Sequence, residues 1–61
     1  MTKIRMYRYK KDITQCELAK MLGVSQSTVT KWELGISYPM AKNLIKLAEI
    51  FECSIDELLK D

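Results

Sequence analysis

The chain has 61 residues, of which 48% are hydrophobic and 30% charged, with two glycines and one proline. This length and balance predict one helical domain, residues 1–61, with a single small core, and they exclude a disordered or low-complexity chain. No apolar run reaches about 18 residues, and Lys3, Arg5 and Arg8 stand where a secretory signal needs apolar residues, so we expect a cytoplasmic protein without a membrane span.

The net charge of +2 is unevenly distributed. Residues 1–46 contain nine of the ten Lys and Arg and three of the eight acids, a net charge of +6, whereas residues 47–61 carry −4. This division is typical of a basic surface that meets a polyanion while the acidic end faces away, although ordinary solvated charge also explains it.

The first predicted helix runs from about Thr2 to Lys11, and one of its faces holds Ile4, Tyr7 and Arg8. Its other basic side chains remain available to solvent. Helices commonly end with a residue in the left-handed conformation, and Asp12 is the candidate for that position here. We expect slight strain there, because aspartate tolerates that conformation less well than glycine.

The stretch from Thr14 to Glu33 contains two short amphipathic segments joined by a tight turn, which predicts a helix-turn-helix motif. Thr14 followed by Glu17 is a capping-box signature, so the first helix of the motif starts near Gln15. Gly23 ends this helix, because glycine enters the left-handed region without a side-chain clash.

The second helix of the motif is predicted to be capped by Ser25 and to bury Val29 and Trp32. The residues left on its outer face are Gln26, Ser27, Thr28, Thr30 and Lys31. A glutamine amide matches the edge of adenine in the major groove, hydroxyls suit bases or phosphates, and lysine suits guanine or phosphate. Any exposed helix face is polar, so the interpretation depends on the whole set.

This pattern resembles the phage repressor and Cro-like (XRE) family of helix-turn-helix DNA-binding domains from Ile4 to Leu59. The matching residues are Gln15, Glu17-Leu18-Ala19, Gly23-Val24-Ser25, Val29, Trp32-Glu33, Gly35 and Pro39. The resemblance implies an all-α, compact five-helix lambda-repressor-like domain. It also implies a sequence-specific binder of double-stranded DNA that regulates transcription, as a repressor, with the helix 25–33 in the major groove.

The outer face and the following loop supply the expected DNA contacts. We expect base contacts from Gln26, Ser27, Thr30 and Lys31. We expect phosphate contacts from Gln15, Ser25, Thr28, Lys10, Lys11, Ser37 and Tyr38. The last two lie in the loop 34–39, which in the resembled family lies on the sugar-phosphate backbone, where exposed backbone amides add donors.

Arg8 stands on an apolar face and therefore needs a partner. Glu33, at the end of the second motif helix, is the candidate acceptor, and the resemblance supports this pairing. We interpret the ion pair as structural, because desolvation offsets much of the attraction of such a pair.

The next helix is predicted from about Ala41 to Phe51, although Met40 replaces the usual polar cap. Its inward residues are Leu44, Leu47, Ala48 and Phe51, and its outward residues are Lys42, Asn43, Lys46 and Glu49. Glu52 replaces a typical glycine terminator, and Ser54 caps a last short helix. The apolar residues of that helix are Ile55, Leu58 and Leu59.

The resemblance also implies a homodimer that binds an inverted-repeat operator. Ile55 and Leu59 are the candidate dimer contacts, because they are apolar on a segment too short to bury both of its sides. The alternative is that both residues complete the core of one subunit.

Several classes of function are excluded by missing residues. The chain has no histidine, and its cysteines, Cys16 and Cys53, form no CxxC pair, so we expect no metal and no cofactor. We interpret Cys53 as a core residue and Cys16 as exposed. Without a catalytic constellation we expect no enzyme, and no small-molecule ligand is implied. The alternative function is a protein-interaction or antitoxin-like module on the same fold.

Overall fold

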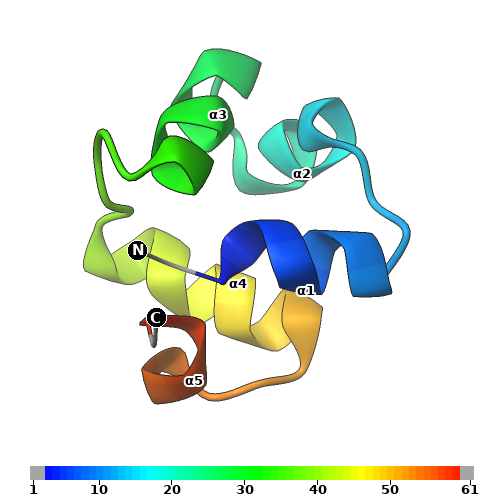
Figure 1. The fold of residues 1–61 in the computed structure, drawn as a ribbon, viewed down its shortest axis with the longest axis vertical. Helices are drawn as coiled ribbons and strands as arrows, with labels where there is room; N and C mark the ends of the chain where they lie inside the picture. The colour runs from blue at the N-terminus through cyan, green and yellow to red at the C-terminus, as the bar shows by residue number, and fades with distance from the viewer. Residues whose placement is uncertain (1–2, 60–61) are drawn as a thin grey trace.

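The computed structural model describes residues 3–59, which form five helices and no strand (Figure 1). The helices are α1 (Ile4–Lys10), α2 (Gln15–Leu22), α3 (Gln26–Leu34), α4 (Ala41–Phe51) and α5 (Ile55–Leu59). The all-α, five-helix prediction is therefore confirmed. The predicted start of the first helix, Thr2, lies outside the described residues, and α1 ends at Lys10 rather than at Lys11.

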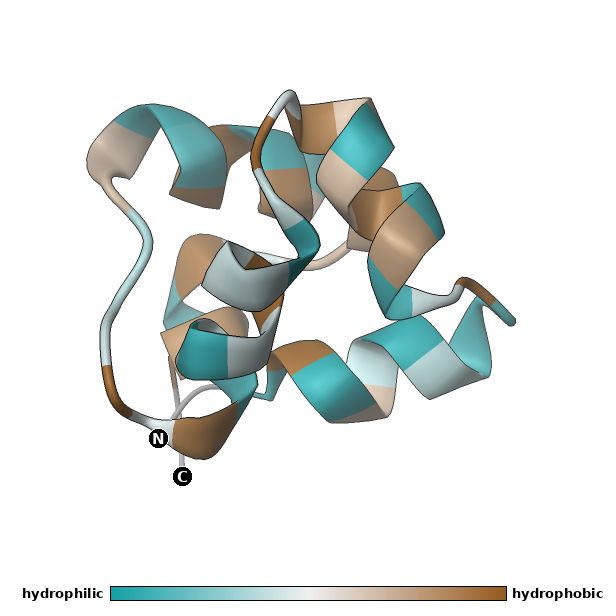
Figure 2. Ribbon diagram, turned by 90° about the horizontal axis from the view of Figure 1, so that it is seen from above, coloured by the Kyte–Doolittle hydropathy of each residue, from teal (hydrophilic) through white to brown (hydrophobic). Residues whose placement is uncertain are grey.

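One hydrophobic core joins all five helices. Its buried residues are Ile4, Leu18, Ala19, Leu22, Val29, Trp32, Leu47, Phe51 and Leu58. α2 packs against both α3 and α4, α1 packs against α3, and α5 packs against α4. Figure 2 shows apolar and polar segments alternating along the helices, which is the pattern of amphipathic helices around a shared core.

Two helix ends use a residue other than glycine in the left-handed region. Asp12 follows α1 with φ 57°, and Glu52 ends α4 with φ 55°. Each was expected to replace a glycine, and each conformation costs roughly 1–2 kcal/mol in a residue with a Cβ. Lys11 Nζ donates to Glu52 Oε2 at 2.6 Å, so an exposed ion pair joins the two turns.

One expected orientation in α4 is wrong. Asn43 was predicted to face outward, yet it is buried, with 8% of its surface exposed. It stands one helical turn before Leu47, which is fully buried, so both residues lie on the face that meets the core. The α4 boundaries match the prediction, and Met40 makes no side-chain hydrogen bond at the N-cap.

Within residues 3–59, no helix has the length and apolar character needed to cross a bilayer.

Candidate nucleic-acid interface

The helix-turn-helix motif has the caps that the sequence predicts. The Thr14 hydroxyl accepts from the Glu17 amide, and the Glu17 carboxylate accepts from the Thr14 amide at 2.9 Å, which completes the capping box. These bonds lower the pKa of Glu17, with the backbone bond from Thr14 as the main cause. Gly23 ends α2 with φ 71°, and no atom lies within 4 Å of the position that a Cβ would take, so the backbone conformation alone requires glycine.

The outer face of α3 is polar, and its inner face is in the core. Val29 and Trp32 are buried as predicted. On the other side Gln26, Ser27 and Lys31 are exposed, while Thr28 and Thr30 are half-buried. The residues expected to touch bases therefore lie on one helix in two adjacent rows, because residues four positions apart are neighbours on a helix surface.

Three hydroxyls meet at the start of α3. Ser25 Oγ accepts from the Thr28 amide at 3.2 Å, which is the predicted N-cap. The same oxygen lies 2.8 Å from Thr28 Oγ1 and 3.1 Å from Ser27 Oγ. Two expected phosphate residues, Ser25 and Thr28, are thus brought together at the positive end of the helix dipole.

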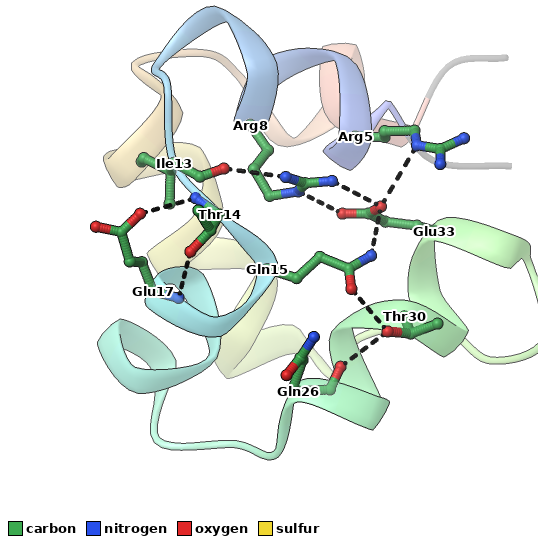
Figure 3. Close-up of polar contacts among 9 residues, drawn as sticks. All are labelled: Arg5, Arg8, Ile13, Thr14, Gln15, Glu17, Gln26, Thr30 and Glu33. Carbon is green, nitrogen blue, oxygen red and sulfur yellow. Dashed lines mark hydrogen bonds and ion pairs between the residues drawn. The ribbon is translucent and has the colours of Figure 1, made fainter.

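The predicted ion pair between Arg8 and Glu33 is present and buried (Figure 3). Arg8 Nε donates to Glu33 Oε2 at 2.7 Å, and Nη2 donates to Oε1 at 3.2 Å. Its third donor, Nη1, bonds to the Ile13 carbonyl at 3.0 Å. The hydrogen-bonded Glu33 carboxylate raises the pKa of Arg8 above its usual value. The pair joins α1 to the C-terminal end of α3.

Gln15 makes two internal hydrogen bonds that were not predicted from the sequence. Gln15 Nε2 donates to Glu33 Oε1 at 3.0 Å, and Gln15 Oε1 accepts from the Thr30 hydroxyl at 2.9 Å (Figure 3). Arg5 was not predicted as a partner of Glu33 either; its Nε lies 3.7 Å from Glu33 Oε1, while 65% of its side chain remains exposed. Neither contact has a local sequence signal, because the partners are far apart in the chain.

The loop between α3 and α4 offers fewer donors than expected. Gly35 ends α3 with φ 77°, as its identity suggests. The amides of Ile36 and Ser37 both donate to the Lys31 carbonyl, at 2.9 and 3.4 Å, so neither is free as the prediction required. The loop also carries two side-chain hydroxyls that can meet a phosphate, on Ser37, which is half-buried, and on Tyr38, which is exposed.

Lys10 and Lys11 lie apart from the α3 residues. Lys10 Nζ is 5.4 Å from the centre of the Tyr7 ring, and Lys11 is paired with Glu52 at the end of α4. Figure 1 shows that the C-terminal ends of α1 and α4 lie away from α3. The structure therefore groups the expected DNA contacts into an α2–α3 set and a separate pair of lysines.

The two cysteines occupy the environments that the sequence predicts. Cys16 is exposed, and Cys53 is half-buried against the core. Burial raises the pKa of the Cys53 thiol. In the part of the chain that the structure describes, no group of three or more acidic or cysteine residues is placed to hold a metal ion.

Comparisons with known proteins agree with this architecture. The profile of the helix-turn-helix family matches residues 4–58. The chain is 40% identical over 57 residues to the HTH-type transcriptional activator BcrR of Enterococcus faecalis and 41% identical over 58 residues to repressor protein C2 of Salmonella phage P22. These alignments cover 93% and 95% of this chain but only 28% and 27% of the two relatives.

A solved structure shows the same fold. The crystal structure of the P22 c2 repressor protein in complex with synthetic operator 9T in the presence of Tl+ matches with a TM-score of 0.87 and 41% sequence identity. The match covers 95% of this chain and 88% of that chain. On these grounds the chain belongs to the helix-turn-helix family, in its phage repressor-like (XRE) form.

Proposed function

We propose that this domain binds double-stranded DNA at specific sequences and acts as a transcriptional repressor in the cytoplasm, with α3 in the major groove. The observation that carries the proposal is the exposed polar face of α3, held by a capped turn and by the buried Arg8–Glu33 pair. The similar P22 c2 repressor is described in complex with an operator, which supports the same partner for this chain.

The contacts divide into two groups under this proposal. Gln26, Ser27, Thr30 and Lys31 meet base edges, where amide, hydroxyl and ammonium groups discriminate between bases. The phosphates near α3 are held by Gln15, Ser25, Thr28, Ser37 and Tyr38. Positive charge at the edge of this interface comes from Lys10 and Lys11. Gln15 retains one Nε2 proton beyond the Glu33 bond, so its internal hydrogen bonds leave it a donor.

Selection of bound sequences from a random duplex pool tests this function. An enriched motif with an inverted repeat is the expected result. A pool that stays unenriched would contradict DNA recognition and favour a protein-interaction module.

Gln26→Ala is expected to relax the preference at one base position, at a cost of about 1–3 kcal/mol for the preferred base. The reason is that a planar amide pairs with one base edge only. Thr28→Ala is the matched control, since loss of a phosphate contact weakens all sequences alike. Competition binding with duplexes that differ at single positions measures both. An unchanged base preference in Gln26→Ala would contradict the assignment.

We further propose that two copies bind one operator through α5. One such domain offers little contact area for tight specific binding, and a two-fold dimer places two recognition helices about 34 Å apart. On α5, Leu59 is 42% exposed and Ile55 is half-buried, so both retain surface for a partner copy.

Ile55→Asp is expected to lower affinity for a full inverted repeat while half-site binding and helical content stay nearly unchanged. A small apolar interface forms weakly without DNA, so wild-type protein at micromolar concentration should be mostly monomeric. Titrations of full and half sites, with circular dichroism on the same samples, measure these effects. Loss of helical content would instead assign Ile55 to the core.

A further inference from the structure

The Thr30 hydroxyl lies between two acceptors of its own protein. It follows Gln26 by one turn on α3, and Figure 3 shows it between the Gln15 amide and the Gln26 main chain. Its oxygen is 2.9 Å from Gln15 Oε1 and 3.1 Å from the Gln26 carbonyl. Hydroxyls have one proton and two lone pairs, so these neighbours determine which part of the group remains for a ligand.

Glu33 decides which way the Gln15 amide points. The Glu33 carboxylate is buried beside the Arg8 guanidinium and, when ionised, accepts hydrogen bonds only. Gln15 must therefore turn its nitrogen toward Glu33, where Nε2 lies 3.0 Å from Oε1. The amide oxygen is then left for Thr30, and it also accepts only.

The Thr30 proton is consequently used inside the protein. Both neighbours of the hydroxyl are acceptors, so the proton serves one or the other, and only oxygen lone pairs remain toward the outside. A phosphate oxygen has no proton to give, so Thr30 has no bond to offer it. The amino group of a base does have a proton, so it can donate to the Thr30 oxygen.

We propose that Thr30 is a specificity residue that acts toward DNA only as an acceptor, and that Gln15 is the positioning residue that fixes this polarity. The inference rests on the proposed DNA binding by α3. In the major groove adenine and cytosine present amino donors, whereas guanine and thymine present carbonyl oxygens. Thr30 therefore favours adenine or cytosine over guanine or thymine at the base that it faces.

Thr30→Val tests the hydroxyl, because valine keeps the shape and the methyl group. Sequence selection with wild-type protein should give adenine or cytosine at one position of each half-site. Thr30→Val should lose a preference of about two- to tenfold at that position alone, the range of one neutral hydrogen bond. Thr30→Ser keeps the hydroxyl and should retain the preference, and circular dichroism checks that each variant is folded.

A base analogue isolates the amino group itself. Purine in place of adenine, or 4-unsubstituted pyrimidinone in place of cytosine, removes only that group at the selected position. With the analogue, the affinity of the wild-type protein should fall by the same factor by which Thr30→Val reduces the base preference. The affinity of Thr30→Val should be the same for the normal duplex and for the analogue. Equal losses in both proteins would overturn the contact.

Gln15→Met tests the positioning role, because methionine has similar length and offers no strong acceptor. The preference at the Thr30 position should shrink in Gln15→Met, since the hydroxyl turns outward more easily when only the Gln26 carbonyl holds it. An unchanged preference would overturn the role of Gln15. If wild-type protein enriches no motif, the proposed function itself fails, and a motif without an amino preference refutes this inference alone.

Discussion

Replacing Glu33 by alanine is expected to lower the free energy of unfolding by about 3–5 kcal/mol, because the Arg8 guanidinium is left buried without its carboxylate. The same change removes the acceptor that orients Gln15. A single core of this size supplies only about 3–5 kcal/mol of stability, so the variant should be largely unfolded. Urea denaturation followed by circular dichroism measures the loss.

Two other variants separate the buried charge from its surroundings. The double variant Arg8→Met with Glu33→Leu should recover most of the stability, since apolar residues replace a buried ion pair at little cost. Arg5→Ala should cost less than about 1 kcal/mol, because Arg5 is mostly exposed and lies 3.7 Å from the carboxylate. A Glu33→Ala protein as stable as Arg5→Ala would refute the structural role of the pair.

Affinity for a specific duplex should fall on the order of a hundredfold between 50 and 200 mM salt if about four phosphates are neutralised, because each contributes about −0.9 to the log-log slope. The unequal charge distribution, +6 in residues 1–46, supports such contacts. Fluorescence anisotropy at a series of salt concentrations gives the slope. Equal affinity at both ends of the series would exclude a major electrostatic contribution.

The two lysines of the α1 end should differ in this assay. Lys10→Gln should reduce the slope by about 0.9 if Lys10 meets a phosphate. Lys11→Gln should reduce it less, because wild-type Lys11 must first leave Glu52, whose pKa it lowers by hydrogen bonding. Lys46→Gln, an exposed change on α4 outside the expected contacts, is the control and should leave the slope unchanged.

The helices and their ends were predictable from the sequence because their signals are local. Thr14 with Glu17, and Ser25 ahead of Val29, mark helix starts through bonds that span three or four residues. Gly23 marks the turn through its own backbone freedom. The Arg8–Glu33 pair was also predictable, since a charge on an apolar face requires a partner and the resemblance indicated which one.

The tertiary structure alone decided the contacts that depend on how the helices pack around their shared core. The predicted outward orientation of Asn43 was wrong, because it was based on the polarity of the side chain. Its position one helical turn before Leu47 directs it toward the core. Gln15 lies on α2, whereas Thr30 and Glu33 lie on α3, and hydrogen bonds join them across the two helices. Such bonds depend on interhelical distances and angles, which the pattern of residue types does not specify.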